Sequence, residues 1–125
     1  MIWYEARVLW LSPYSGGRSK LFAGFRYSTD ALFPEQGRWH DKSRAAKEEM
    51  YWSVVIDFDE EPHLQGNPSL GRITFLAVEA PQQWLYPGQV VEVYEGKQPS
   101  AVIEVGLELP EFSDSLPVKL GDDQP

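Results

Sequence analysis

Apolar residues recur at every second position in this chain, and this period of two is the strongest constraint on its fold. In Ile2–Leu11, for example, Tyr4, Ala6, Val8 and Trp10 would share one face of a strand. Six further segments are expected to form strands, with turn residues between them: Leu21–Tyr27, Asp30–Phe33, Tyr51–Phe58, Arg72–Ala80, Val90–Tyr94 and Ala101–Leu109. No amphipathic crossover helices separate these segments. We therefore expect an all-β fold, a closed antiparallel β-barrel of about six strands with a short helical insertion.

Composition agrees with a single compact domain. The chain has 125 residues, of which 42% are hydrophobic and 14% aromatic, and this length can bury a core without a disulfide or a metal. Cysteine is absent, which excludes disulfides and thiolate metal sites. No apolar run approaches the ~20 residues of a membrane helix and no signal peptide is recognisable, so we expect a cytoplasmic protein. The alternation assigns these residues to the barrel core: Val8, Trp10, Phe25, Val54, Ile56, Phe75, Val93 and Val105.

Two polar segments and a tail are expected to interrupt or extend the barrel. Pro34–Met50 is predicted to be a loop with a short helix, which Asp41 can cap. Asp59–Leu70 contains prolines, a glycine and an asparagine and is predicted to be a loop. Residues 110–125 form an acidic, proline-containing tail that we expect to be flexible. The barrel domain is therefore assigned to residues 1–109.

Glycine-anchored motifs lie near both ends of the barrel segment. Gly16-Gly17-Arg18 is followed by Gly24-Phe25-Arg26, and Leu85-Tyr86-Pro87-Gly88 is followed by Tyr94-Glu95-Gly96. In this order the motifs resemble the C-terminal β-barrel domain (domain III) of translation elongation factor Tu, here as a free-standing domain, and the resemblance covers most of residues 3–107. It implies a barrel fold. It also implies that Arg18, Phe25 and Arg26 lie on the strand and turn that help elongation factor Tu to hold aminoacyl-tRNA.

The same glycines and arginines have a purely structural interpretation. The glycines would permit tight turns and close strand approach, while Arg18 and Arg26 would pair with local carboxylates. The net charge of −8 favours this interpretation, because nucleic-acid binders neutralise phosphates with lysine and arginine. A basic protein is the expected partner, a nuclease toxin being one example, because an acidic surface would attract it. The acidic charge would otherwise serve only solubility.

One predicted loop carries a cluster of potential ligands for a divalent cation. Asp57, Asp59, Glu60, Glu61 and His63 offer carboxylate oxygens and one imidazole. Their order does not match the ligand pattern of an EF-hand loop. Carboxylates on loops usually face water, so the alternative is a solvated strand end that binds no metal.

Evidence for catalysis in the sequence is weak. His40-Asp41 would suit a general base with an orienting acid, but neighbours in sequence rarely adopt that geometry and no nucleophile can be paired with them. No phosphate-binding Gly-x-x-x-x-Gly-Lys-Ser/Thr motif occurs. We therefore expect neither an enzyme nor a cofactor.

Aromatic residues in predicted loops indicate a binding function. Trp39 and Trp84 lie there, and each either anchors an interface or plugs a barrel end. The predicted function is a non-catalytic protein-binding module, and a toxin-neutralising immunity protein is one version of it. Some toxins engage elongation factor Tu, so the resemblance implies that a mimic could block such a toxin. The alternative is a translation-associated domain that binds tRNA or the ribosome. We assign the partner surface to Arg18, Phe25, Arg26, Trp39, Asp59, Glu60, Glu61 and Trp84.

Overall fold

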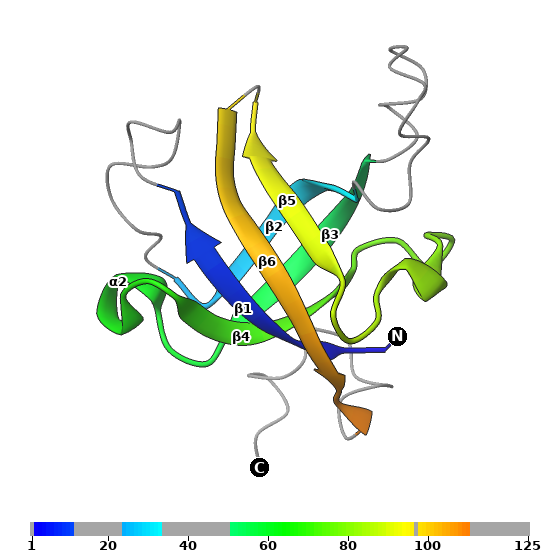
Figure 1. The fold of residues 1–125 in the computed structure, drawn as a ribbon, viewed down its shortest axis with the longest axis horizontal. Helices are drawn as coiled ribbons and strands as arrows, with labels where there is room; N and C mark the ends of the chain where they lie inside the picture. Colours follow the sequence, from blue (N-terminus) through cyan, green and yellow to red (C-terminus); the bar gives the residue numbers. More distant parts are fainter. Residues whose placement is uncertain (1, 12–23, 34–50, 97, 111–125) are drawn as a thin grey trace.

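The computed structural model describes residues 2–11, 24–33, 51–96 and 98–110, in which six antiparallel strands close into a barrel (Figure 1). The strands are β1 (Tyr4–Trp10), β2 (Arg26–Leu32), β3 (Tyr51–Phe58), β4 (Ser69–Phe75), β5 (Val90–Glu95) and β6 (Gln98–Glu108). Around the barrel their order is β1-β4-β3-β2-β5-β6, and the pairing of β6 with β1 closes the ring. The expected fold class, an all-β closed antiparallel barrel, is confirmed.

The alternation seen in the sequence builds the inner face of the barrel. Along β1, Ala6, Val8 and Trp10 are buried, whereas Glu5 and Arg7 are exposed. Burial of each large aliphatic side chain contributes about 1.5–3 kcal/mol, so these inward rows are the main source of stability. The predicted core residues that are buried are Val8, Trp10, Val54, Ile56, Phe75, Val93 and Val105.

The prediction that Phe25 belongs to the core is wrong, because its side chain is 56% exposed. Phe25 precedes β2 and lies beyond a barrel end that three other rings already fill. The Trp10 ring centroid lies 6.0 Å from that of Tyr27 and 6.1 Å from that of Phe58. This aromatic cluster closes the core at that end and leaves Phe25 at the surface.

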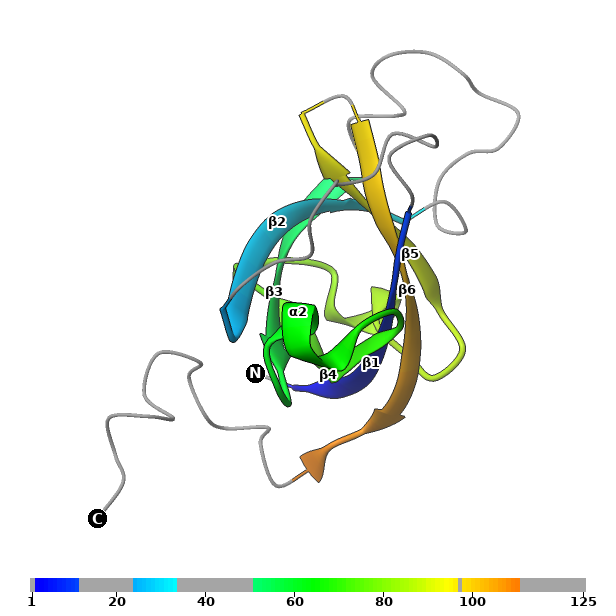
Figure 2. The same cartoon turned by 90° about the vertical axis from the view of Figure 1, so that its left-hand side faces the viewer.

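A second aromatic cluster closes the opposite end of the barrel. The Phe33 ring centroid lies 5.3 Å from that of Phe75 and 5.6 Å from that of Trp84. Trp84 belongs to a short 3-10 helix, η3 (Gln82–Trp84). Figure 2 looks onto the first end, the one that the Trp10 cluster fills. There the helix α2 (Pro62–Gln65) lies in front of the ring of strands. The two ends are therefore covered by different loops.

The helix α2 corrects the expectation that Asp59–Leu70 is only a loop. Pro62 occupies the start of the helix, where its missing N–H costs nothing. Gly66 follows the helix at φ 92°, and its N–H donates to the Pro62 carbonyl at 2.8 Å. The Gln65 side chain then bonds the carbonyls of Glu60 and Leu70, at 2.6 and 2.9 Å. These side-chain bonds stabilise a helix of a single turn.

Two strand boundaries also differ from those predicted. The short strands expected on either side of Ser28 and Thr29 form the single strand β2. Ser28 faces solvent there, and the Thr29 hydroxyl donates to the Tyr94 carbonyl at 3.1 Å. Polar residues therefore do not break this strand.

The strand β4 begins before the predicted Arg72 and ends at Phe75, well short of Ala80. Asn67 explains the early start, because its side chain bonds both the N–H and the carbonyl of Trp10 at 2.8 Å. These bonds align the incoming chain with the end of β1. After Phe75, the apolar residues Leu76 and Val78 are 53% and 77% exposed, and they lie in a turn.

The strand β3 is buried on its outer face as well as on its inner face. Val55 and Thr74 point away from the core but are 2% and 0% exposed, and Trp3 is fully buried. The Thr74 hydroxyl donates to the Ile2 carbonyl at 2.7 Å, which ties the chain before β1 to this side of β4. The outer face of the sheet is therefore partly buried at Val55 and Thr74.

Some expectations lie outside the described residues, namely the helix within Pro34–Met50 and the tail after Pro110. The strand β6 ends at Glu108, and the domain limit at residue 109 stays a prediction. Within the described part of the chain, no helix is long and apolar enough to cross a membrane.

Candidate functional site

A row of charged residues of alternating sign crosses the outer face of four neighbouring strands. Arg26 of β2 lies opposite Asp57 of β3, and Asp57 lies opposite Arg72 of β4. Arg72 in turn lies opposite Glu5 of β1. Opposite charges on adjacent strands attract one another across the sheet, so the register itself orders this row.

Asp57 is the centre of the row. Arg26 Nε donates to Asp57 Oδ1 at 2.6 Å and Arg26 Nη2 donates to Oδ2 at 2.9 Å. Arg72 Nη2 lies 3.9 Å from Oδ2, and its guanidinium carbon lies 5.8 Å from the centroid of the Trp3 ring. The Asp57 side chain is only 6% exposed, and a buried carboxylate requires such partners.

This geometry bears on the interpretation of Arg26. The Arg26 guanidinium binds the carboxylate of Asp57 on the neighbouring strand. This is the role expected under the purely structural interpretation of the glycine and arginine motif. The pairing with a local carboxylate is therefore confirmed for Arg26. Arg18, the other arginine of the motif, lies outside the described residues.

A groove of about 670 Å³ follows the outer side of β4, β1 and β6. Gly71 and Gly106 contribute only backbone atoms to its lining, and its charged lining includes Glu5, Arg7 and Asp59. A groove that combines apolar lining with charged side chains can receive a segment of a partner protein.

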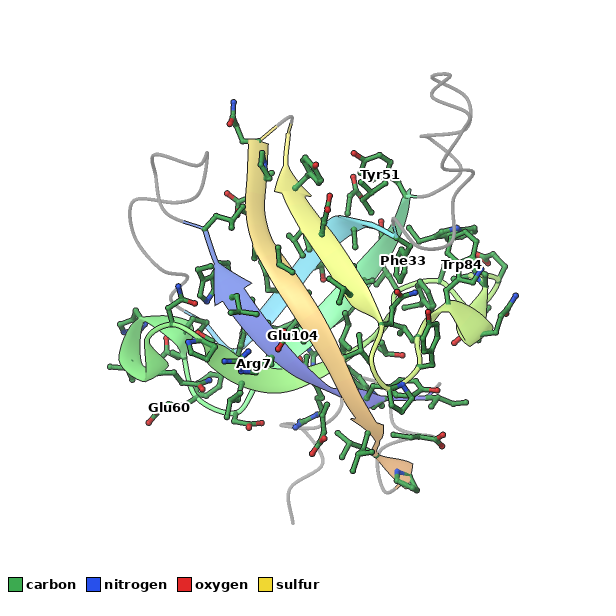
Figure 3. The ribbon with its side chains drawn as sticks, in the orientation of Figure 1. Arg7, Phe33, Tyr51, Glu60, Trp84 and Glu104 are labelled. Atoms are coloured by element: carbon green, nitrogen blue, oxygen red, sulfur yellow. The ribbon has the colours of Figure 1, made fainter. Side chains whose placement is uncertain are left out.

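Two polar contacts order the sides of the groove. Arg7 Nη1 donates to Glu104 Oε1 at 2.6 Å, and the two side chains lie side by side in Figure 3. Glu5 Oε1 accepts from the Leu107 N–H at 3.0 Å. Arg7 and Glu104 are about half exposed, so their pair contributes at most about 1 kcal/mol to stability. Its charges remain within reach of a ligand at the surface.

The acidic loop lies beside α2 at one end of the barrel. Asp59 and Glu60 are exposed, and Figure 3 shows Glu60 pointing away from the barrel. Glu61 Oε1 lies 3.9 Å from His63 Nδ1. Among the described residues, no three carboxylate or imidazole groups converge on a point suited to a metal ion. Asp57 does not join the loop, because its oxygens are bonded to Arg26.

The candidate aromatic residues do not form one site. Phe25 lies next to the acidic loop, since its carbonyl accepts from the Phe58 N–H at 2.6 Å. Trp84 lies at the opposite end, partly buried and packed against the core (Figure 3). Of the two roles considered for Trp84, its ring contacts favour that of a plug. Trp39, together with the pair His40-Asp41, lies outside the described residues.

The structure therefore brings together Phe25, Arg26, Asp59, Glu60 and Glu61, and it separates Trp84 from them. Sequence reasoning missed the groove residues Glu5, Arg7 and Glu104. Charges at alternate positions of a strand are a usable signal for the first two. Glu104 could not be joined to them, because Arg7 and Glu104 are separated by 97 residues.

Comparisons with protein-family models, with curated proteins and with solved structures find no match to this chain.

Proposed function

We propose that this chain is a non-catalytic module that binds a basic protein. One observation carries the proposal, namely the excess of carboxylates over arginines on the barrel. In the described part of the chain, three arginines stand against eleven carboxylates, so its net charge of −8 equals that of the whole chain. The arginines are Arg7, Arg26 and Arg72, and the carboxylates are those of Glu5, Asp30, Asp57, Asp59, Glu60, Glu61, Glu79, Glu92, Glu95, Glu104 and Glu108.

The few positive charges on the barrel are also locally compensated. Each of the three arginines lies within 4.0 Å of a carboxylate, at 2.6 Å for Arg7, 2.6 Å for Arg26 and 3.9 Å for Arg72. The remaining carboxylates set the sign of the field around the barrel. Such a field speeds encounter with a basic protein and repels nucleic-acid backbones.

The surface around Phe25 offers the apolar contact that charge alone does not supply. The ring is 56% exposed, and the Phe25 carbonyl accepts from the N–H of Phe58, the residue that precedes the acidic loop of Asp59, Glu60 and Glu61. An aromatic anchor surrounded by polar groups is a common composition for the centre of a protein interface. We therefore propose that this end of the barrel meets the partner.

A toxin-neutralising immunity protein is the version of this function that we favour. The resemblance to domain III of elongation factor Tu supports it, because a free-standing mimic of that domain would meet toxins that engage the factor. We also propose that the protein acts in the cytoplasm. A charged barrel without a catalytic role suits an inhibitor, which needs a stable surface rather than a reactive group.

Affinity capture from a native lysate tests the proposal. The tagged full-length chain is used as bait, with and without ribonuclease treatment, and the triple variant D59N/E60Q/E61Q is the control bait. We expect the wild-type bait to retain a basic protein in both lysates, and we expect the control bait to retain less of it. Retention of tRNA, or of a partner that ribonuclease releases, contradicts the proposal and supports the translation-associated alternative.

A further inference from the structure

Arg72 lies between a buried carboxylate and a buried aromatic ring. Its Nη2 atom is 3.9 Å from Asp57 Oδ2, and its guanidinium carbon is 5.8 Å from the centroid of the Trp3 ring. The Arg72 side chain is 20% exposed, and Trp3 is fully buried. The attraction between a guanidinium and a tryptophan ring is stronger where both are shielded from water. The Trp3 ring therefore helps to keep the Arg72 guanidinium near Asp57.

The backbone that carries the Trp3 ring is anchored at two points. The Trp3 carbonyl accepts from the Leu109 N–H at 2.8 Å. The carbonyl of the preceding residue, Ile2, accepts from the Thr74 hydroxyl at 2.7 Å. These bonds tie the segment before β1 to the end of β6 and to β4. The ring beside Arg72 is therefore held in place by two other parts of the barrel.

Arg26 and Arg72 approach the same carboxylate from the two neighbouring strands. Asp57 of β3 lies opposite Arg26 of β2 and opposite Arg72 of β4. The Nη2 atoms of Arg26 and Arg72 are 2.9 and 3.9 Å from the same oxygen, Asp57 Oδ2. Because the Asp57 side chain is only 6% exposed, water screens these attractions little. Two cations on opposite sides limit the rotation of the carboxylate, and the carboxylate sets the orientation of the Arg26 guanidinium.

The position of Phe25 depends on the bonds at the start of β2. The residue before it, Gly24, has a φ of 152°, which glycine adopts readily, so the chain is not held by its local conformation there. With 56% of its surface exposed, the Phe25 ring receives limited support from packing. Its carbonyl accepts from the Phe58 N–H at 2.6 Å, and the next residue, Arg26, is bonded to Asp57. A change in the Arg26–Asp57 pair should therefore reach the Phe25 ring.

We propose that Arg72 is a positioning residue for Phe25. Arg72, held beside Trp3, fixes the Asp57 carboxylate. That carboxylate orients Arg26, which fixes the strand start from which the Phe25 ring projects. The inference rests on the proposed function for its biological purpose, because Phe25 is the aromatic anchor proposed there. An anchor that is fixed before binding loses less conformational entropy when the partner arrives, and this favours tighter binding.

Backbone order parameters from NMR of the isotope-labelled full-length chain test this role without the partner. Arg72→Met removes the charge but keeps a long, unbranched side chain against Trp3. We expect the order parameter of the Phe25 amide to fall from about 0.85, typical of rigid backbone, toward about 0.6. A loss of global stability alone does not change these ps–ns motions of the folded molecule. Arg7→Met, which removes an exposed arginine–glutamate pair, is the matched control and should leave Phe25 rigid. A rigid Phe25 in Arg72→Met, or equal changes in the two variants, would overturn the proposal.

Two milder variants decide the question if Arg72→Met does not fold. Arg72→Lys keeps a positive charge near Asp57 but loses the planar contact with Trp3, so we expect a smaller loss of order at Phe25. Trp3→Phe keeps a ring that attracts the guanidinium more weakly, and it should loosen Phe25 in the same direction. If both milder variants keep Phe25 as rigid as in the wild type, the proposal fails.

Binding kinetics with the captured partner separate this inference from the proposed function. We expect Arg72→Met to raise the off-rate about three- to tenfold, because the bound complex must then order a loosened anchor. If Phe25 loosens in Arg72→Met but the chain captures no basic protein, the positioning role stands and the proposed function fails. If a basic protein is captured, and Arg72→Met keeps Phe25 rigid and releases that protein at the wild-type rate, the proposed function stands and the positioning role fails.

Discussion

Arg26 and Asp57 face each other on adjacent strands and are joined by two parallel hydrogen bonds, of 2.6 and 2.9 Å, at the outer surface of the barrel. The carboxylate is almost fully buried, while the arginine is about one third exposed. The pair links the start of β2 to the end of β3. It therefore fixes the barrel end from which Phe25 and the acidic loop project.

Removing the carboxylate of this pair should destabilise the fold. We expect Asp57→Ala to lower the free energy of unfolding by about 2–4 kcal/mol, because Arg26 and Arg72 then lose a buried partner. Glu104→Ala removes the half-exposed partner of Arg7 and should cost no more than about 1 kcal/mol. Urea unfolding at neutral pH measures both. Equal losses in the two variants would show that burial of the Asp57 pair has no special effect.

Two phenylalanines provide a matched test of the core assignment. Phe75 is 0% exposed and Phe25 is 56% exposed. Phe75→Ala should cost about 3–5 kcal/mol through lost transfer energy and a cavity, whereas Phe25→Ala should stay within about 0.5 kcal/mol. Val54→Ala is expected to cost about 1–4 kcal/mol. A large loss from Phe25→Ala would place its ring in the core.

Gly71 permits a close approach of two strands. A Cβ at this position would lie 2.3 Å from the Asp57 carbonyl oxygen, which belongs to the backbone and cannot move aside. At Gly106 the Cβ would meet the Glu5 carboxylate at 2.7 Å and Glu5 Cβ at 3.0 Å. The carboxylate can rotate away at the loss of its bond to the Leu107 N–H, so the closest contact there can be relieved. We expect Gly71→Ala to cost about 1–3 kcal/mol and Gly106→Ala to cost less. Thermal unfolding of the two variants shows which substitution lowers the stability more.

Much of the barrel could be predicted from local pattern. The alternation in Tyr51–Phe58 and in β1 marks their inward faces correctly, since an inward row must be apolar. The outer faces were harder to predict. Val55 and Asp57 are buried on the outer face, and the chain before β1 contacts Thr74 of the neighbouring strand β4. No local pattern reveals contacts of that kind. Phe25 shows the converse, because its ring is exposed only as a result of three other rings filling the barrel end.

The candidate sites depend even more on register. A surface hollow of about 420 Å³ beside β2, β3 and β5 joins Asp30 with Tyr94 and Glu95, which lie more than 60 positions further along the chain. Either carboxylate alone resembles an ordinary solvated residue. Their proximity follows from the pairing of β2 with β5, which depends on how the barrel closes. The acidic loop was easier to find because Asp59, Glu60 and Glu61 are consecutive.

Tyr27 predicts a loss of stability at alkaline pH. Burial first, and the hydrogen bond to Glu95 second, raise its pKa in the folded state, while the unfolded value is about 10. Above that pH the unfolded chain releases the proton first, so stability present at lower pH is lost as the pH rises toward the raised folded pKa. Tyr27→Phe should be less stable at neutral pH and should lose less stability above about pH 10. Urea unfolding at several pH values across this range measures how the free energy of unfolding changes with pH. An equal loss of stability in the variant and in the wild type would contradict this prediction.

The binding of a basic partner by the acidic barrel is tested most directly by the association rate measured at two salt concentrations. With the captured partner, we predict that the on-rate falls at least about tenfold between ~0.1 M and ~1 M salt, as the Debye length drops from about 10 to 3 Å. We also predict a lower on-rate for D59N/E60Q/E61Q at low salt, with its melting temperature nearly unchanged. An on-rate that is independent of salt, and equal in the wild type and the triple variant, would contradict recognition through this acidic surface.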